Sequence, residues 1–155
     1  MSETLSGTLK EQALLCVDDP ALQQKIGADL EDLGFQSVIP VSTEKTLEQI
    51  KSSPYRVIVL EDDFQGMPLN NSPIYQELAQ MPMSLRRNIF LILLAAGAKH
   101  LDPMEAFSLS VNLLLDKARV KRDDDLKGIL QQEISQYAKF YLVYARVKEQ
   151  ISQGK

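Results

Sequence analysis

Two short apolar runs in this sequence, residues 13–17 and 57–60, lead directly into acidic residues. The acidic residues that follow the two runs are, in chain order, Asp18, Asp19, Glu61, Asp62 and Asp63. Adjacent carboxylates repel one another, and carboxylate oxygens are the ligands that Mg²⁺ and Ca²⁺ prefer. If the two runs lie side by side, the adjacent pair of Asp18 and Asp19 is best explained by a present or former cation site.

The apolar runs themselves predict the elements that place these carboxylates. Both runs are short and unbroken and contain β-branched residues, which is typical of strands buried on both faces of a parallel sheet. The carboxyl ends of neighbouring parallel strands meet at one edge of an open α/β sheet, where such sheets place their functional sites. We therefore expect an acidic crevice at that edge. For Asp62 and Asp63 the simpler interpretation is that they are solvated residues of a turn.

The rest of the chain alternates predicted strands with predicted helices. Apolar runs predict strands at residues 13–17, 35–41, 55–61, 89–96 and 111–116. Apolar residues at helical spacing, together with capping residues and first-turn prolines, predict helices at residues 20–33, 43–51, 73–85, from 102 onward, and 123–152. This alternation predicts a parallel sheet covered by helices on both faces. We expect one domain over residues 12–155, preceded by a disordered segment over residues 1–11.

The composition limits the classes of function. A net charge of −4 and a pI near 5.0 argue against a nucleic-acid partner or an anionic membrane surface. The longest apolar run, residues 89–98, is about half as long as a membrane-spanning helix requires, so we expect a cytoplasmic protein. Cys16, the only cysteine, is expected to pack inside the first strand. His100 is expected to be a surface residue, and Arg86 with Arg87 the solvated end of a helix.

Four segments of the sequence resemble the receiver domains of two-component response regulators. The segments LLCVDDP and YRVIVLE resemble the first and third strands of that family, and FLILLAA and VNLLLDK resemble its fourth and fifth. The resemblance places Asp18 and Asp19 at the magnesium-binding positions and Glu61 at the position of the phosphorylated aspartate. It places Ala95 where the family has a Ser or Thr, and Lys117 at the position of the family's lysine. It implies the flavodoxin-like (βα)5 fold, a three-layer α/β sandwich with strand order 2-1-3-4-5, extended here by a long C-terminal helix.

Two departures from the receiver pattern bear on phosphorylation. Phosphoryl transfer needs an in-line nucleophile, a divalent cation, and donors that contact the transferred oxygens. Glu61 is one methylene longer than aspartate, and a displacement of about 1 Å can lower a rate by about a hundredfold. Ala95 offers no hydroxyl donor. A carboxylate at position 61 instead provides a standing negative charge that Lys117 can pair, which imitates the phosphorylated state.

These departures predict a pseudo-receiver that works as a phosphorylation-independent signalling or protein-interaction module and is not an enzyme. The alternative is a receiver still phosphorylated on an acidic residue at the end of the third strand, with Asp62 or Asp63 as acceptor if that strand runs longer. A small hydrolase or phosphatase is a more distant reading, because no nucleophile and base occur at a recognisable spacing. We expect no cofactor other than weak or absent Mg²⁺ binding at Asp18, Asp19 and Glu61.

The predicted final helix carries an apolar stripe and is too long for the sheet. From residue 124 to residue 152 it spans about 43 Å, whereas a strand of five or six residues spans about 17 to 20 Å. Its second half is therefore expected to project, with apolar residues at heptad spacing for about two heptads. The residues of this stripe are Tyr137, Phe140, Tyr141, Tyr144, Val147 and Ile151. An exposed apolar stripe predicts homodimerisation or docking of a protein partner, and the alternative is that it packs on the domain's own surface.

Overall fold

The sheet of this protein has five parallel strands, and their order confirms the predicted fold. The computed structural model describes residues 10–122 and 125–153, and in the last helix it describes the side chains of residues 126–139, 150 and 151. Across the sheet the strands are β2 (Gln36–Val38), β1 (Gln12–Cys16), β3 (Tyr55–Glu61), β4 (Phe90–Ala95) and β5 (Leu113–Asp116). This is the flavodoxin-like order 2-1-3-4-5.

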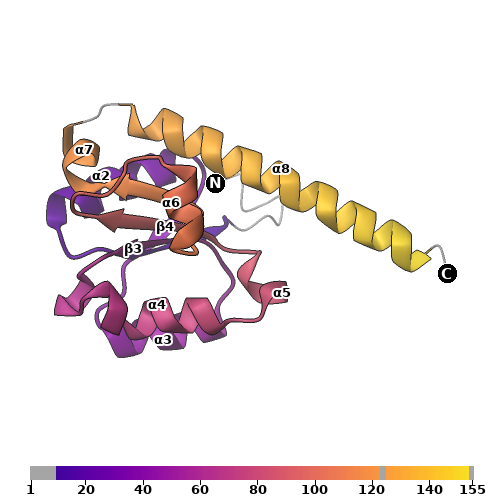
Figure 1. Cartoon of the computed structure of the whole chain (residues 1–155), viewed down its shortest axis with the longest axis horizontal. Helices are drawn as coiled ribbons and strands as arrows, with labels where there is room; N and C mark the ends of the chain where they lie inside the picture. The colour runs from indigo at the N-terminus through magenta and orange to yellow at the C-terminus, as the bar shows by residue number, and fades with distance from the viewer. Residues whose placement is uncertain (1–9, 123–124, 154–155) are drawn as a thin grey trace.

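Helices cover both faces of the sheet (Figure 1). One face is covered by α2 (Pro20–Asp32), α7 (Lys117–Arg122) and α8 (Leu126–Gln153), and the other by α3 (Thr43–Ser52), α4 (Pro73–Gln80) and α6 (Pro103–Ser108). Successive strand residues point to opposite faces, so Val57 of β3 belongs to the core on the α2 side and Ile58 to the core on the α4 side. Both faces of the central strand are buried, which explains why its sequence is a continuous apolar run.

Helix α2 ends just before Gly34, the residue that the sequence predicts to stop it. Gly34 has a φ of +101°, in the left-handed region that glycine adopts without steric cost. The N–H of Gly34 donates to the carbonyl of Glu31 at 3.0 Å, and the N–H of Phe35 donates to the carbonyl of Leu30 at 3.0 Å. This pair of bonds closes the helix and turns the chain into β2.

The helix predicted over residues 73–85 is in fact two helices. Helix α4 ends at Gln80, and a separate short helix, α5 (Met83–Arg86), follows. Pro82 separates them, because a proline has no N–H for the helical ladder and disfavours helical backbone at the residue before it. Met81 accordingly has extended backbone, with a ψ of 139°.

Other predicted boundaries also differ from the structure, most of all those of the second strand. The second strand was predicted over residues 35–41, but only Gln36–Val38 pairs with β1. The final helix was predicted to begin at residue 123, and residues 123–124 lie outside the described residues. The preceding α7, which begins directly after β5, was not predicted at all.

The first part of α8 packs on the domain and the rest extends beyond it (Figure 1). Leu126 and Leu130 are buried in the core on the α2 side, and Ile134 and Tyr137 pack partly against that core. The helix has 28 residues and therefore spans about 42 Å. Within the described residues no helix is long and apolar enough to cross a membrane.

Candidate functional site

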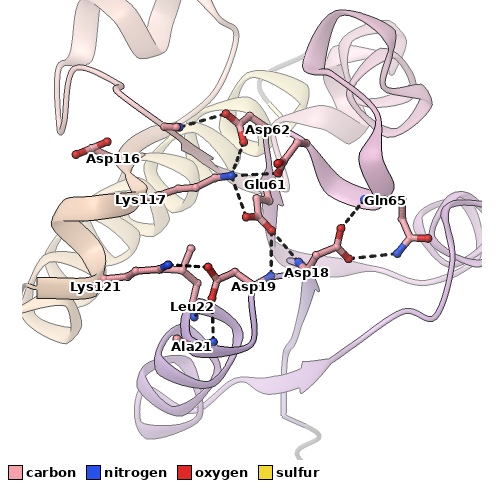
Figure 2. Close-up of polar contacts among 12 residues, drawn as sticks. Asp18, Asp19, Ala21, Leu22, Glu61, Asp62, Gln65, Asp116, Lys117 and Lys121 are labelled. Carbon is pink, nitrogen blue, oxygen red and sulfur yellow. Dashed lines mark hydrogen bonds and ion pairs between the residues drawn. The ribbon is translucent and has the colours of Figure 1, made fainter.

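The C-terminal ends of the strands bring the predicted acidic residues to one edge of the sheet (Figure 2). Glu61 is the last residue of β3 and lies beside Leu94 of β4 in the ladder. Its side chain is only 5% exposed. Asp18 and Asp19 follow β1, and Lys117 is the first residue of α7, directly after β5. Parallel strands thus place all four residues at one edge of the sheet.

Both carboxylate oxygens of Glu61 are engaged by donors of the protein. Oε1 accepts the backbone N–H of Asp18 at 2.7 Å and that of Asp19 at 3.3 Å. Oε2 lies 2.9 Å from Nζ of Lys117. A buried carboxylate requires such partners because an unpaired buried charge is strongly destabilising. The carboxylate of Glu61 is therefore held in place by the protein itself.

The ammonium group of Lys117 is shared by three carboxylates. Besides contacting Glu61, its Nζ lies 2.6 Å from Oδ1 of Asp62 and 3.1 Å from Oδ1 of Asp63. An ammonium group has three N–H donors, so these carboxylates match its full capacity. Burial alone lowers the pKa of Lys117, but its hydrogen bonds to Asp62, Glu61 and Asp63 outweigh burial and raise the pKa above the ordinary lysine value.

Asp62 is not the solvated turn residue that the sequence suggests. Its Oδ2 accepts the backbone N–H of Ala96 at 3.2 Å, and its own N–H donates to the carbonyl of Leu94 at 2.9 Å. The Asp62 carboxylate therefore connects Lys117 to the chain just beyond β4. Asp63, which is 67% exposed, is closer to the expected turn residue, although it also pairs with Lys117.

Asp18 is held by a loop residue that the sequence analysis did not identify. Oδ2 of Asp18 accepts the backbone N–H of Gln65 at 2.6 Å, and Oδ1 accepts the side-chain amide of Gln65 at 3.2 Å. Gln65 lies in the short helix η1 (Phe64–Gly66) and has a φ of +58°, a left-handed conformation that is uncommon for a residue other than glycine. This backbone turn aims the N–H of Gln65 at Asp18.

Asp19 has a structural task at the start of α2. Its Oδ1 accepts the backbone N–H groups of Ala21 at 3.0 Å and Leu22 at 3.3 Å, which caps the helix. Its Oδ2 lies 2.8 Å from Nζ of Lys121. The hydrogen bond from Lys121, followed by the bond from the N–H of Leu22, lowers the pKa of Asp19. Asp18 and Asp19 thus face different partners, which relieves their mutual repulsion without a cation (Figure 2).

Asp18, Asp19 and Glu61 do not fit a magnesium ion in this arrangement. Mg²⁺ requires oxygens that converge on one point with near-octahedral geometry. Each of the three carboxylates is instead bonded to N–H donors, to an ammonium group, or to both. In the part of the chain that the structure describes, no group of three or more His, Cys, Asp or Glu side chains could hold a metal ion.

The end of β4 presents backbone donors in place of a hydroxyl group. Ala95 is the last residue of β4 and lies opposite Asp116 of β5 in the ladder. The N–H groups that follow it belong to Ala96 and Gly97. The first donates to Asp62, and the second donates to Oδ1 of Asp116 at 2.9 Å. Acidic side chains of the protein therefore occupy both donors.

Sequence reasoning missed Gln65, Lys121 and Asp116. Lys121 follows Lys117 by four residues, so both lie on one face of α7 and reach the same edge. That spacing was a usable signal, but it depends on recognising α7 as a helix. The contact of Gln65 has no comparable signal, because it depends on a left-handed backbone within a loop.

The sequence analysis also makes predictions for residues outside the carboxylate cluster, among them Cys16, His100 and Arg86. Cys16 is buried as expected, and burial, with a smaller contribution from Asp18, raises the pKa of its thiol. His100 is half-buried rather than a simple surface residue, and its Nδ1 accepts the N–H of Asp116 at 3.0 Å. Arg86 is not a solvated helix end, because its guanidinium donates to groups on two other segments.

Solved structures of receiver proteins and of a sensor protein share this fold. A CheY-like receiver domain protein from Methanospirillum hungatei matches with a TM-score of 0.60 at 17% identity, over 85% of this chain and 98% of that chain. A response regulator receiver protein from Burkholderia phymatum matches with a TM-score of 0.56 at 17% identity, over 81% and 96% of the two chains. A sensor protein from a Polaromonas species matches with a TM-score of 0.58 at 23% identity, over 83% and 99%. The sequence itself matches no family model and no curated protein. The chain thus has the fold of response-regulator receiver domains.

Proposed function

We propose that this protein is a degenerate receiver that works as a phosphorylation-independent signalling or protein-interaction module. The observation that carries the proposal is the contact of one ammonium group, that of Lys117, with Glu61, Asp62 and Asp63. The other oxygen of Glu61 accepts the N–H of Asp18. The cluster is therefore satisfied by groups of the protein alone. The receiver fold supports a signalling role, and the satisfied cluster supports a role without phosphorylation.

Phosphorylation of Glu61 would have to dismantle several of these contacts. A nucleophilic oxygen would have to leave either Lys117 or the N–H groups that bind Oε1. A cation at the acidic pair would have to displace Gln65 from Asp18 and Lys121 from Asp19. Ala95 has no hydroxyl group to bind a transferred oxygen. Each change costs stabilising interactions before any chemistry begins.

The cluster also supplies the negative charge that a phosphoryl group would bring. Asp62 binds Nζ of Lys117 and the N–H of Ala96, so its charge lies between the ends of β3 and β4. Hydrogen bonds to charged groups are about twice as strong as neutral ones. We infer that this edge keeps one conformation, and that the availability of a partner, rather than phosphorylation, controls the output.

The projecting part of α8 is the proposed docking surface for a second copy of the chain or for another protein. The helix continues to Gln153, well beyond the buried Leu126 and Leu130 (Figure 1). At its far end Ile151 is 62% exposed. The apolar stripe in the sequence supports this role. Four stripe residues have side chains outside the described residues: Phe140, Tyr141, Tyr144 and Val147.

Tyr137 takes a different role from the rest of the predicted stripe. Its ring packs edge-on against Phe90 with the ring centroids 5.5 Å apart, and its hydroxyl group donates to the carbonyl of Arg87. Tyr137 thus anchors α8 to its own domain. For this residue, the alternative prediction that the stripe packs on the domain's own surface holds. The proposed docking surface therefore begins after Tyr137.

Mass measurement of the intact protein after incubation with Mg²⁺ and acetyl phosphate tests the phosphorylation-independent function. We expect no added phosphoryl group, because Glu61 and Lys117 are held by each other and by neighbouring groups. An adduct that disappears in Asp62→Asn or Asp63→Asn would support the rival function, a receiver phosphorylated at the end of β3. The reciprocal variant, Glu61→Asp with Ala95→Thr, is expected to regain some labelling.

Light scattering tests the proposed surface on α8. The intact chain is expected to form a dimer that a Tyr144→Glu, Val147→Glu variant does not form, because charges in an apolar seam oppose association. A Gln131→Glu, Gln132→Glu variant, with both changes at exposed positions in the first half of α8, is the matched control. If the intact chain and the double variant are both monomers at high concentration, and no partner binds through α8, the proposed surface is wrong.

A further inference from the structure

A groove lies at the edge of the sheet opposite the acidic cluster. It is bounded by the C-terminal end of α4, by α5, by the C-terminal end of α6 and by Tyr137 of α8. In Figure 1 the arrow of β4 points away from α5, so the groove is at the N-terminal ends of the strands. Its volume is about 760 Å³, within the range of about 300 to 1,000 Å³ that is usual for small-molecule sites.

The guanidinium group of Arg86 lines this groove and is held by neutral groups only. Nη1 donates to the carbonyl of Ile89 at 2.9 Å and to Oδ1 of Asn112 at 3.3 Å. Nη2 donates to the carbonyl of Ser110 at 3.0 Å. A guanidinium group has five N–H donors, so two of them have no hydrogen bond to a described residue. Among the described residues, no carboxylate forms an ion pair with Arg86.

The backbone around Ser110 fixes the position of this cation. Ser110 has a φ of +61°, and its N–H donates to the carbonyl of Phe107 at 3.0 Å, while the N–H of Val111 donates to that of Ala106 at 3.0 Å. These bonds close the end of α6 and turn the carbonyl of Ser110 toward Arg86. The guanidinium is thus preorganised by the fold before any anion arrives.

The electrostatics of Arg86 favour an anionic ligand. Burial lowers the pKa of Arg86, which means that the fold penalises its charged form, although arginine remains protonated at neutral pH. Three carboxylates pair with Lys117, whereas no carboxylate of a described residue pairs with Arg86. A carboxylate that approached the two remaining donors of Arg86 would make charge-assisted bonds in a partly desolvated site.

Apolar side chains form much of the wall of the groove. Leu78 and Val111 form buried parts of the lining, and Tyr137 closes one end. Met83 and Phe107 stand at the rim, 65% and 80% exposed. Large apolar side chains left in water beside a groove are typical of binding sites. Methionine is unbranched and flexible, so Met83 can adapt to the body of a ligand.

We propose that this groove binds a small amphiphilic carboxylate, with its carboxylate on Arg86 and its apolar body between Met83, Phe107 and Tyr137. The guanidinium group of Arg86 binds the carboxylate of the ligand, and the apolar side chains of the groove bind its apolar part. The volume suits a small molecule, and such a site is independent of whether the acidic edge is phosphorylated.

Titration of the full chain with dodecanoate, below its micelle concentration, tests this site by amide NMR. We expect saturable shifts in α5, in residues 107–112 and around Tyr137. Dodecanol and dodecyltrimethylammonium, which share the apolar body but lack the carboxylate, are expected to bind at least about tenfold more weakly.

Variants assign the effect to the groove. Arg86→Gln is expected to weaken dodecanoate binding by about tenfold or more, while Arg119→Gln, an exposed arginine of α7 at the acidic edge, leaves it unchanged. Phe107→Ser is expected to keep the fold because Phe107 is largely exposed. It should weaken dodecanoate binding several-fold, and it tests the groove even if Arg86→Gln fails to fold. Equal binding of all three probes, or shifts confined to the far half of α8, would overturn the proposal. So would unchanged affinity in both groove variants.

Discussion

A half-buried cation lies at each of two edges of the sheet: Lys117 where the strands have their C-terminal ends, and Arg86 where they have their N-terminal ends. The groups that surround these two cations differ in charge. At the C-terminal edge, Lys117 contacts three carboxylates at 2.6 to 3.1 Å. At the N-terminal edge, Arg86 contacts two carbonyl groups and one side-chain amide oxygen. Carboxylates of the chain neutralise the charge of Lys117, whereas Arg86, among the described residues, donates hydrogen bonds only to neutral oxygens. The comparison teaches that the edge where α/β sheets usually bind ligands is closed here, whereas the opposite edge keeps binding capacity.

The largest expected effect follows from removing the cation of the closed edge. Lys117→Met leaves buried Glu61 and its neighbour Asp62 without their positive partner. We expect the free energy of unfolding to fall by about 3 to 5 kcal/mol, the usual cost of breaking a buried ion pair from one side. Urea unfolding measures it. Lys121→Met, whose partner Asp19 is more exposed, is the control and should cost no more than about 1 kcal/mol. Equal losses in the two variants would show that Lys117 is not special.

A smaller effect is expected at the open edge. Arg86→Met removes three hydrogen bonds but leaves no uncompensated charge behind. The cost should therefore be about 1 to 3 kcal/mol, less than for Lys117→Met. Arg119→Met, at an exposed position, should change stability by about 0.5 kcal/mol or less. The contrast between the edges would collapse if Arg86→Met were the more damaging of the two cation replacements.

The ion pair between Asp19 and Lys121 is expected to depend on pH. Because its folded-state pKa is lowered, mainly by Lys121, Asp19 contributes stability above its unfolded value of about 3.9, and this contribution is lost as the pH falls through the folded value. Asp19→Asn keeps a capping oxygen, so it should cost no more than about 1 kcal/mol at neutral pH. Denaturation series at several pH values should show this difference shrinking in acid. If the difference in unfolding free energy between the intact protein and Asp19→Asn stays constant as the pH falls below about 3.9, the ion pair is not its cause.

The smallest expected effect is that of Mg²⁺ on thermal stability. A cation that binds only the folded state raises the unfolding midpoint. Because Asp18, Asp19 and Glu61 are each engaged by groups of the protein, we expect no clear rise at millimolar Mg²⁺. A clear rise that disappears in Asp19→Asn would mean that the acidic edge opens to a cation after all.

Much of the fold could be predicted because its signals are local. The apolar run before Glu61 marks a central strand, and Gly34 marks a helix end through its own backbone conformation. The positions of the acidic residues follow from the same logic, since the ends of parallel strands meet. The break at Pro82 also had a local signal, but apolar residues on both sides of it suggested a continuous helix.

Apart from Lys117, which the sequence suggests as a partner of Glu61, the partners of the site residues could not be predicted because they depend on geometry over long sequence separations. Gln65 reaches Asp18 only through a left-handed turn. Arg86 reaches the carbonyl of Ser110, 24 positions away, only because the chain turns through a left-handed residue just after α6. Neither contact has a spacing that a pattern could reveal. The same limitation explains why the carboxylates suggested a cation site whereas the structure shows internal pairing.

The side-chain NMR signals of Lys117 test the central claim, that the acidic edge is closed by its own lysine, most directly. An ordinary lysine titrates near pH 10.4. Because the pKa of Lys117 is raised, its pairing contributes stability that is fully present below that pH and is lost only as the pH rises through the higher folded value. We therefore predict that, as the pH is raised past the ordinary lysine value, Lys117 remains charged and immobile, whereas a lysine of ordinary pKa would lose its proton. Titration of Lys117 at the ordinary lysine value would contradict the account.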